Sequence, residues 1–145
     1  MKFSSVAVVL AHRVPELWAQ CRPLIQSAIA TSPDRGNVDR IYDQLLMGER
    51  ELLVGLDSLG AVQAVLVLRY QPERDGFIVH IQAAAGRGLL SARDEWAELL
   101  RWLCTKKVKR IQLHCQAAQE RLWRRMGFET AYRVMWFEMP AQGEK

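Results

Sequence analysis

The sequence predicts a single-domain α/β fold, a mixed and mostly antiparallel sheet with helices on both faces. The chain has 145 residues, half of them apolar and a quarter charged, which suits one soluble domain with its own core. Two helical patterns precede three consecutive β-rich runs, and helical and β-rich segments alternate after them. That order is typical of a sheet covered by helices on both sides. No linker or repeat divides the chain, so one domain is expected over residues 1–145.

The first expected elements are a strand and a helix. Val6–Leu10 is a continuous apolar run, which indicates a buried strand or an extended entry segment. Pro15 suits a first helical position, and apolar residues recur at helical spacing over Leu17–Ile29. Pro23 lies inside this pattern and should kink the helix or split it.

A second short helix and a hairpin are expected next. Asn37 is a good N-cap for the helix, and Gly48 is its stop signal. Glu51–Leu56 and Ala61–Tyr70 are β-rich runs. Asp57-Ser58-Leu59-Gly60 between them is typical of a hairpin turn.

The third strand leads into a loop of small residues. Pro72–Gly76 is a turn signal, and Phe77–Gln82 is apolar and β-rich, so the three strands form a meander. Ala83–Gly88 follows as a predicted loop with almost only small side chains. The next helix should start at Ser91 and turn the face Trp96–Cys104 to the core.

The remaining elements are a strand, a helix and a last strand. Arg110–Cys115 is β-rich, and a short helix contains Leu122–Met126. Gly127 then ends the helix, and Phe128 anchors a final strand over Ala131–Met139. Trp136 lies in the densest apolar part of this strand, which indicates either burial on both faces or a dimer contact.

Charge and cysteine content exclude several function classes. The net charge of +4 is mild, and the basic run Lys106–Arg110 is typical of a solvated helix end. The alternative interpretation of this run is a phosphate or nucleic-acid contact, although no aromatic residues interleave it as a stacking platform for single strands would require. Cys21, Cys104 and Cys115 form no metal-ligand spacing, so no metal site is expected, and they indicate buried free thiols. Val6–Ala11 is too short for a signal peptide or a membrane span. We therefore expect a soluble cytoplasmic protein.

The loop of small residues carries the first functional hypothesis. A strand that enters such a loop at the start of a helix exposes backbone N–H groups to an anion such as a pyrophosphate. Arg87 is the best placed side chain for a phosphate, because its guanidinium can bind two oxygens at once.

The order of elements resembles the GCN5-related N-acetyltransferase (GNAT) superfamily, whose members hold acyl-CoA at this loop. Members carry Arg/Gln-x-x-Gly-x-Gly/Ala there. One register places Gly86-Arg87-Gly88 on Gly-x-Gly, with Ala83 where Arg or Gln belongs. The other places Ala84-Ala85-Gly86 on the motif, with Ile81 at its head. The resemblance implies that Gln82, Ala84, Ala85, Gly86, Arg87 and Gly88 contact the cofactor.

A second motif follows the expected strand Arg110–Cys115. Members often read Asn-x-x-Ala-x-x-Leu-Tyr-x-x-x-Gly-Phe, and Gln116, Leu122 and Gly127-Phe128 stand at the Asn, Leu and Gly-Phe positions. The resemblance adds Gln116 to the cofactor-binding residues. The family's tyrosine protonates the departing thiolate in many members, but Trp123 stands at its position. An indole N–H is not a usable acid, so this departure counts against ordinary acetyl transfer.

Small phage and prophage proteins with a GNAT-like layout look similar as well. They share an apolar strand before Ala-Ala-Gly, a Trp-Ala pair on an acidic helix, and an aromatic helix before the last strand. Ile81–Gly86, Trp96-Ala97 and Trp123–Phe128 fit this pattern. The resemblance implies a degenerate GNAT-like protein of phage type.

Two histidines could supply the base that amine transfer requires. His80 lies on the strand that enters the loop and is the candidate catalytic base, since an unperturbed imidazole titrates near neutral pH. His114 lies near the end of the next strand, at the matching edge of the sheet. A backbone N–H near Gln82 would stabilise the thioester oxygen. The alternative interpretation, which single histidines fit more often, is that each is a partly buried residue with one satisfied hydrogen bond.

The sequence thus predicts an N-acyltransferase that uses acetyl-CoA or another acyl-CoA to acylate an amine, or a degenerate relative of one. Whether it is catalytically active, and whether the amine belongs to a small molecule or a protein, stays open. The alternative is a non-catalytic phage accessory or assembly protein that binds a protein partner.

Overall fold

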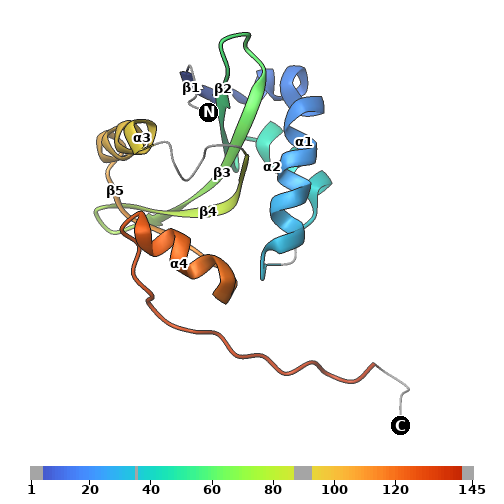
Figure 1. Ribbon diagram of the computed structural model, residues 1–145, viewed down its shortest axis with the longest axis vertical. Coiled ribbons are helices and arrows are strands. Elements are labelled where there is room, and N and C mark those ends of the chain that lie inside the picture. Colours follow the sequence, from blue (N-terminus) through green and yellow to red (C-terminus); the bar gives the residue numbers. More distant parts are fainter. Residues whose placement is uncertain (1–4, 35, 87–92, 142–145) are drawn as a thin grey trace.

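The computed structural model describes residues 5–34, 36–86 and 93–141 and shows one five-stranded sheet between helices (Figure 1). In chain order the elements are β1 Ser5–Val9, the 3-10 turn η1 Ala11–Arg13, α1 Val14–Thr31, α2 Val38–Leu46, β2 Glu51–Leu56, β3 Val62–Glu73, β4 Gly76–Gly86, α3 Arg93–Thr105, β5 Val108–Leu113 and α4 Ala117–Arg125. The expected order of helices and strands is confirmed as far as α4, and the leading apolar run is the strand β1.

The sheet has the order β1-β2-β3-β4-β5, and its neighbouring strands are also neighbours in sequence apart from the helices between them. The first four strands pair antiparallel, and β5 pairs parallel to β4. This confirms the mixed, mostly antiparallel sheet. The crossover from β4 to β5 runs through α3, as a parallel connection requires.

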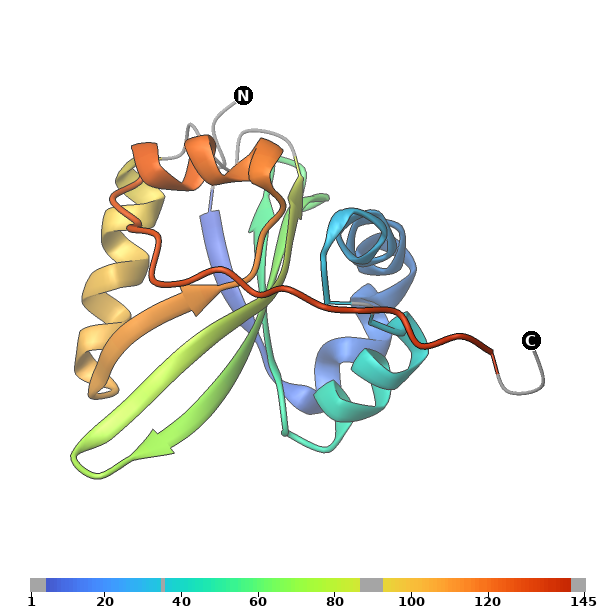
Figure 2. The same cartoon turned by 90° about the horizontal axis from the view of Figure 1, so that it is seen from below.

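Helices cover both faces of the sheet (Figure 2). One core joins α1 and α2 to the sheet through buried side chains such as Ile25, Ile41 and Val67. The other joins α3 to the opposite face through Leu68, Val79 and Leu103. The three inner strands, β2, β3 and β4, therefore send side chains into both cores, whereas β1 packs only into the first and β5 only into the second. None of the described helices combines the length and hydropathy of a membrane span.

Two local predictions are confirmed by hydrogen bonds. The Asn37 side chain accepts from the backbone N–H groups of Asp39 and Arg40, which caps α2. In the hairpin turn, the Asp57 carboxylate accepts from the N–H groups of Leu59 and Ala61. Short polar side chains that satisfy nearby backbone donors explain both signals.

The structure corrects the predicted bounds of β3 and β4. β3 continues through Glu73, so the turn is shorter than Pro72–Gly76. β4 continues through Gly86, so Ala83–Gly86 is strand and not loop. The reason is that these residues pair with β3, for example Ala85 with Val65. The rest of the predicted loop, Arg87 and Gly88, lies outside the described residues, as does the expected helix start at Ser91.

A β-bulge interrupts β4 next to this extension. Val67 pairs with Ala83 and Leu68 with Ile81, so Gln82 is the extra residue on β4. Ile81 packs into the core under α3, whereas Ala83 packs into the core under α1. The bulge therefore exchanges the two faces of β4, and it leaves His80 and Gln82 on the side of α1.

Other corrections concern the helices and the last strands. α1 is one continuous helix with Pro23 inside it, so the proline does not split it. β5 starts and ends two residues earlier than Arg110–Cys115, and Cys104 is exposed, not buried. The predicted strand Ala131–Met139 is absent: these residues form no strand and run away from the body of the domain (Figure 1). An apolar pattern makes a strand only where a sheet edge accepts it.

Candidate functional site

The site lies where β4 and β5 part. Their parallel pairing ends with Ile81 opposite Leu113, and β4 continues to Gly86 with only β3 as its partner. The open side borders a cleft of about 190 Å³. The lining residues come from the end of α1, from β4, from the end of β5 and from α4: Ala28, Thr31, Ser32, Ile81, Gln82, Ala83, Ala84, Ala85, Gly86, Leu113, His114, Gln119, Leu122 and Trp123.

The β4 side of this cleft offers backbone amides. In an extended strand successive N–H groups point to opposite edges, so about every second amide after Ile81 points away from β3. Small side chains at Ala84, Ala85 and Gly86 leave these amides accessible from the cleft. The sequence predicts small residues and available amides at this place, but as a loop and not as a strand.

Gly86 is held in place by close packing against β3. Its φ is +130°, and a Cβ atom there would lie 2.3 Å from the Cα of Ala64 and 2.4 Å from the carbonyl oxygen of Gln63. Only glycine fits this backbone. Its identity is therefore explained by the sheet, independently of any ligand.

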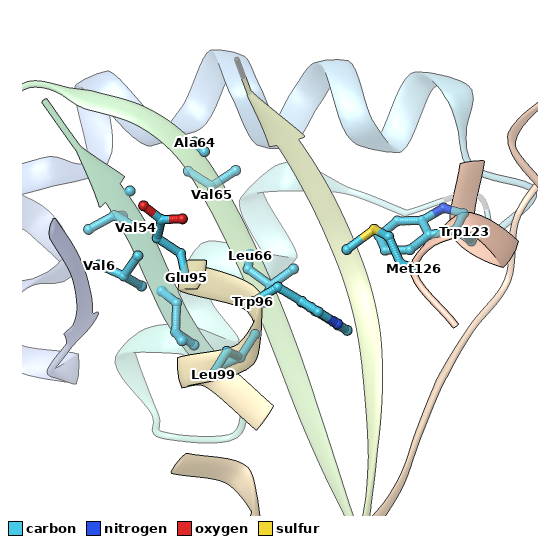
Figure 3. Close-up of a pocket in the computed structure, with 12 residues that line it drawn as sticks. Val6, Val54, Ala64, Val65, Leu66, Glu95, Trp96, Leu99, Trp123 and Met126 are labelled. Atoms are coloured by element: carbon cyan, nitrogen blue, oxygen red, sulfur yellow. The ribbon is translucent and has the colours of Figure 1, made fainter. Parts of the chain in front are cut away.

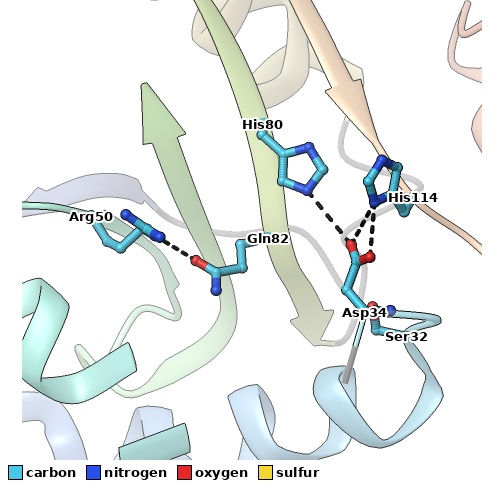
Figure 4. A network of polar contacts seen from close by, with 6 residues as sticks. All are labelled: Ser32, Asp34, Arg50, His80, Gln82 and His114. Atoms are coloured by element: carbon cyan, nitrogen blue, oxygen red, sulfur yellow. Dashed lines mark hydrogen bonds and ion pairs between the residues drawn. The ribbon is translucent and has the colours of Figure 1, made fainter. Parts of the chain in front are cut away.

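Asp34, His80 and His114 come together at the mouth of the cleft (Figure 4). Asp34 lies in the loop after α1, where its N–H donates to the Ser32 hydroxyl. Its two carboxylate oxygens lie 2.9 Å and 2.8 Å from Nδ1 of His114. The His80 ring stands edge-on to that of His114, with centroids 4.8 Å apart. Nε2 of His80 lies 3.7 Å from the Asp34 carboxylate.

The contact with Asp34 determines which nitrogen of His114 is free. A carboxylate only accepts hydrogen bonds, so Nδ1 must carry the hydrogen. In the neutral ring Nε2 is then an acceptor. The His114 side chain is 40% exposed and lines the cleft, so this imidazole can meet a molecule bound there. The pair has the geometry of an oriented general base.

His80 is placed differently. It is only 5% exposed and is not among the lining residues of the cleft, and its Nδ1 has no hydrogen-bond partner. Burial lowers the pKa of His80, and the nearby His114 and Arg69 lower it further against the opposing effect of Asp34. His80 is thus a buried ring behind the dyad of Asp34 and His114, and its lowered pKa favours the neutral form.

Among the described residues, the same three side chains are the group whose ligand atoms could hold a metal ion. Their spacing in the sequence does not indicate this group, because Asp34 lies far from both histidines along the chain. Their ligand atoms lie within 4.8 Å of one another. The ligand atoms of a tetrahedral zinc site lie roughly 3.3 Å apart. The shorter contact between Asp34 and His114 is hydrogen-bond spacing, and the orphaned Nδ1 of His80 lacks the second partner that a metal-bound histidine has. The spacing fits a hydrogen-bonded dyad better than a metal centre.

Three predicted cofactor residues need separate comment. Gln82 lies at the bulge, and its side-chain oxygen accepts from Arg50 at 2.7 Å (Figure 4). Gln116 is the N-cap residue of α4 and does not line the cleft, whereas Gln119, one turn later, does. Arg87 lies outside the described residues together with Gly88. Cys115 follows His114, but burial raises the pKa of its thiol, which disfavours a nucleophilic thiolate.

Trp123 separates this cleft from a second cavity on the other face of the sheet. That cavity of about 50 Å³ is lined mainly by apolar side chains, with Trp96 and Leu99 of α3 opposite Leu66, and Met126 beside Trp123 (Figure 3). Its small volume and apolar walls make it a packing gap in the core. The Trp123 ring also packs edge-on against Phe128, with centroids 5.3 Å apart, so it acts as a wall.

Comparisons with known proteins identify the fold. No protein-family model matches the chain, and no curated protein matches its sequence. Among solved structures, the ribosomal-protein-alanine N-acetyltransferase from Brucella melitensis biovar Abortus 2308 matches with a TM-score of 0.66 at 13% identity, over 93% of this chain and 99% of that chain. An aminoglycoside acetyltransferase from an uncultured soil metagenomic sample matches with a TM-score of 0.67 at 9% identity, over 95% and 96%. The chain has the GNAT fold.

A third structure, the "possible acetyltransferase" of Clostridium difficile 630, matches at 11% identity with a TM-score of 0.63, over 94% of this chain and 97% of that chain. At such identities the likeness concerns the fold and not the individual site residues. The GNAT fold expected from the element order is confirmed, although its motifs are poorly matched.

Within this GNAT fold, Asp34 is the site residue that sequence reasoning missed. It lies in a loop without a recognisable motif, 46 residues before His80 and 80 before His114. Only the packing of α1 on the sheet brings this loop to the strand ends. The Ser32 and Asp34 pair was a readable local turn signal, but it does not indicate a partner.

We expect the free energy of unfolding to fall as the pH drops below about 6.5, the ordinary pKa of histidine. The folded pKa of His80 is lowered, so the unfolded chain takes up a proton that the folded chain refuses. This contribution is complete above the unfolded pKa and is lost as the pH falls toward the folded one. Denaturant titrations between pH 7.5 and pH 5 measure it.

The matched variant for this test is His80→Gln, which cannot titrate. Its unfolding free energy should depend less on pH in this range than that of the natural chain, while Asp34 and His114 remain in both. Identical slopes for the two proteins would show that His80 is not the buried neutral group.

Proposed function

We propose that the protein is an acyl-CoA-dependent N-acyltransferase that transfers an acyl group, such as acetyl, to an amine. The observation that carries the proposal is the oriented imidazole of His114 in a cleft that β4 and β5 leave open. The GNAT fold and its acetyltransferase neighbours support it. Three free cysteines suit a reducing cytoplasm.

The residues of the cleft fit an acyl-CoA. Backbone amides and small side chains from Gln82 to Gly86 would hold it along β4, and Leu122 and Trp123 of α4 would cover its apolar part. Bound acyl-CoA supplies an activated acyl thioester. An amide at the Gln82 bulge would donate to the negative charge that develops on the acyl oxygen.

His114 would remove a proton from the attacking amine. Asp34 keeps the proton on Nδ1, so Nε2 accepts, and the carboxylate stabilises the imidazolium that forms. His80 would position the ring of His114 from behind. It stays a candidate base in its own right, as the sequence predicts, and its variant belongs in the same experiment. Trp123 supplies no acid at the exit position, so the CoA thiolate released as the C–N bond forms and the C–S bond breaks would take its proton from the His114 imidazolium or from water.

The test is thermal unfolding with and without ligand. Acetyl-CoA or CoA should raise Tm, because a ligand at 100 times its Kd stabilises the folded state by about 2.7 kcal/mol. Gln119→Trp fills the cleft from α4 and should remove most of the shift. Ala118→Trp, on the exposed neighbouring position, should keep it.

A natural chain whose Tm stays flat at millimolar acetyl-CoA and CoA would overturn the proposal. It would leave the non-catalytic, partner-binding alternative in front. An equal loss in Gln119→Trp and Ala118→Trp would place the ligand elsewhere. Thiol release with a panel of small amines and amine-bearing peptides then identifies the acceptor class.

A further inference from the structure

The C-terminal segment, defined here as residues 129–141, exposes an unusual amount of apolar surface. Its large apolar side chains are between 64% and 95% exposed: Tyr132, Val134, Met135, Trp136, Phe137 and Met139. Figures 1 and 2 both show the segment as an extended chain that leaves the domain. Contiguous apolar surface of this kind marks an interaction site.

The sheet offers a matching edge. β5 is the last strand in the order β1-β2-β3-β4-β5, and within the described part of the chain no strand pairs with its outer side. An uncovered edge presents a row of backbone N–H and C=O groups to any added strand. β5 has six residues, and the apolar run 131–139 is long enough to cover it.

The composition of the segment suits that edge. Tyr, Val, Trp and Phe have high β-propensity, and Ala131–Met139 contains each of them. β5 borders the core under α3, where Val108, Ile111 and Leu113 are only partly buried. A strand beside β5 would cover these side chains with its own apolar ones.

The place where the segment leaves the domain determines whether it can reach β5 of its own chain or β5 of another molecule. Phe128 is clamped between Trp96 and Trp123, with ring centroids 5.9 Å and 5.3 Å apart. Beyond this clamp the chain runs away from the sheet rather than back along β5 (Figure 1). The segment is thus presented outward, and among the described residues it forms no strand beside β5 of its own domain.

We propose that two copies of this chain exchange their C-terminal segments, so that residues 131–139 of each copy form a sixth strand beside β5 of the other. The exchange is reciprocal, so a two-fold axis closes it and leaves neither edge open. The three aromatic side chains of each segment would bury roughly 900–1,500 Å² over the whole dimer. That is near the size of a stable protein–protein interface.

The first experiment measures the mass of the full-length protein in solution by sedimentation equilibrium across a range of concentrations. The natural chain should be a dimer. Trp136→Asp together with Phe137→Asp should give a folded monomer, because these side chains are exposed in the single domain and its core does not need them. Leu59→Asp is the control, since Leu59 is 92% exposed on the hairpin turn far from β5. It should stay dimeric.

The second experiment locates the contact. In a chain with Cys104 and Cys115 replaced by serine, Arg110→Cys on β5 is co-expressed with a second, tagged chain that carries one cysteine at a position from 132 to 136. A mixed disulfide between the two chains is expected at one or more positions. With both cysteines in one chain, exchange predicts linked dimers.

Two results would overturn the proposal. One is a monomer at every concentration, and the other is a disulfide within a single chain, which would mean that the segment covers its own β5. Neither result bears on acyl-CoA binding, which the Tm shift measures separately.

Discussion

His114→Ala is expected to lower kcat by about a hundredfold or more while acyl-CoA still raises Tm. Removing a positioned general base costs about 10²–10⁴ in rate. The His114 ring borders the cleft, whereas the amides of β4 that would hold the ligand do not depend on it. Binding and turnover should therefore separate in this variant.

Companion variants assign the roles within the group. Asp34→Asn keeps the shape but offers an amide that can also donate, so it no longer enforces a proton on Nδ1; a smaller loss of kcat is expected. His12→Ala is the matched control, because His12 lies exposed in the turn η1 and should leave kcat unchanged.

The outcome also separates the two histidines. A rate unchanged in His114→Ala but lowered about a hundredfold in His80→Ala would make His80 the base and remove His114 from the mechanism. Both rates lowered, with an altered pH profile only in His114→Ala, is the result expected if His80 positions the ring of His114. Rates that respond to neither substitution would contradict a histidine base altogether.

Gly86→Ala is expected to lower the free energy of unfolding by about 3 kcal/mol or more. The new Cβ would fall 2.3 Å from the Cα of Ala64, in a backbone conformation at φ +130° that alanine rarely adopts. The close atoms belong to backbone on β3, so they can yield only if the sheet shifts. Tm should fall by roughly 10 °C in a domain of this size.

The matched control is Gly60→Ala. Gly60 also has a positive φ, +80°, but nothing lies within 4 Å of an added Cβ. This variant should lose only about 1 kcal/mol, the cost of the left-handed conformation. Equal losses at the two positions would show that the contact between β4 and β3 is not what restricts Gly86.

Much of the fold could be predicted because short patterns of neighbouring residues indicate its helices and turns. Helical spacing in α1 and the Asn37 cap of α2 identify helices from a few neighbouring residues. The same holds for the hairpin turn at Asp57–Gly60. Each of these signals depends only on a few neighbouring residues, so it can be recognised without knowledge of the rest of the structure.

The functional assignment of single residues was harder to predict. His80 and His114 were recognised because each lies near the end of one of two neighbouring predicted strands, and the structure brings their rings together. Which of them reaches the cleft depends on burial, since His80 is covered under α1 and His114 is not, and which residues of β4 line the cleft after His80 depends on the bulge at Gln82. A one-residue insertion changes the face of every later side chain, and no composition signal announces it.

The sequence by itself determined the order of elements as far as α4, the two helix-covered faces and the GNAT layout, because periodicity and turn residues are local properties. Only the tertiary structure decided that Ala83–Gly86 is strand, that Asp34 joins the two histidines and that Ala131–Met139 forms no strand. Each of these depends on a partner far away in sequence: β3, the strand ends, or a free sheet edge. The free energy of strand pairing depends on both of the segments that pair, so the sequence of one segment alone does not predict it.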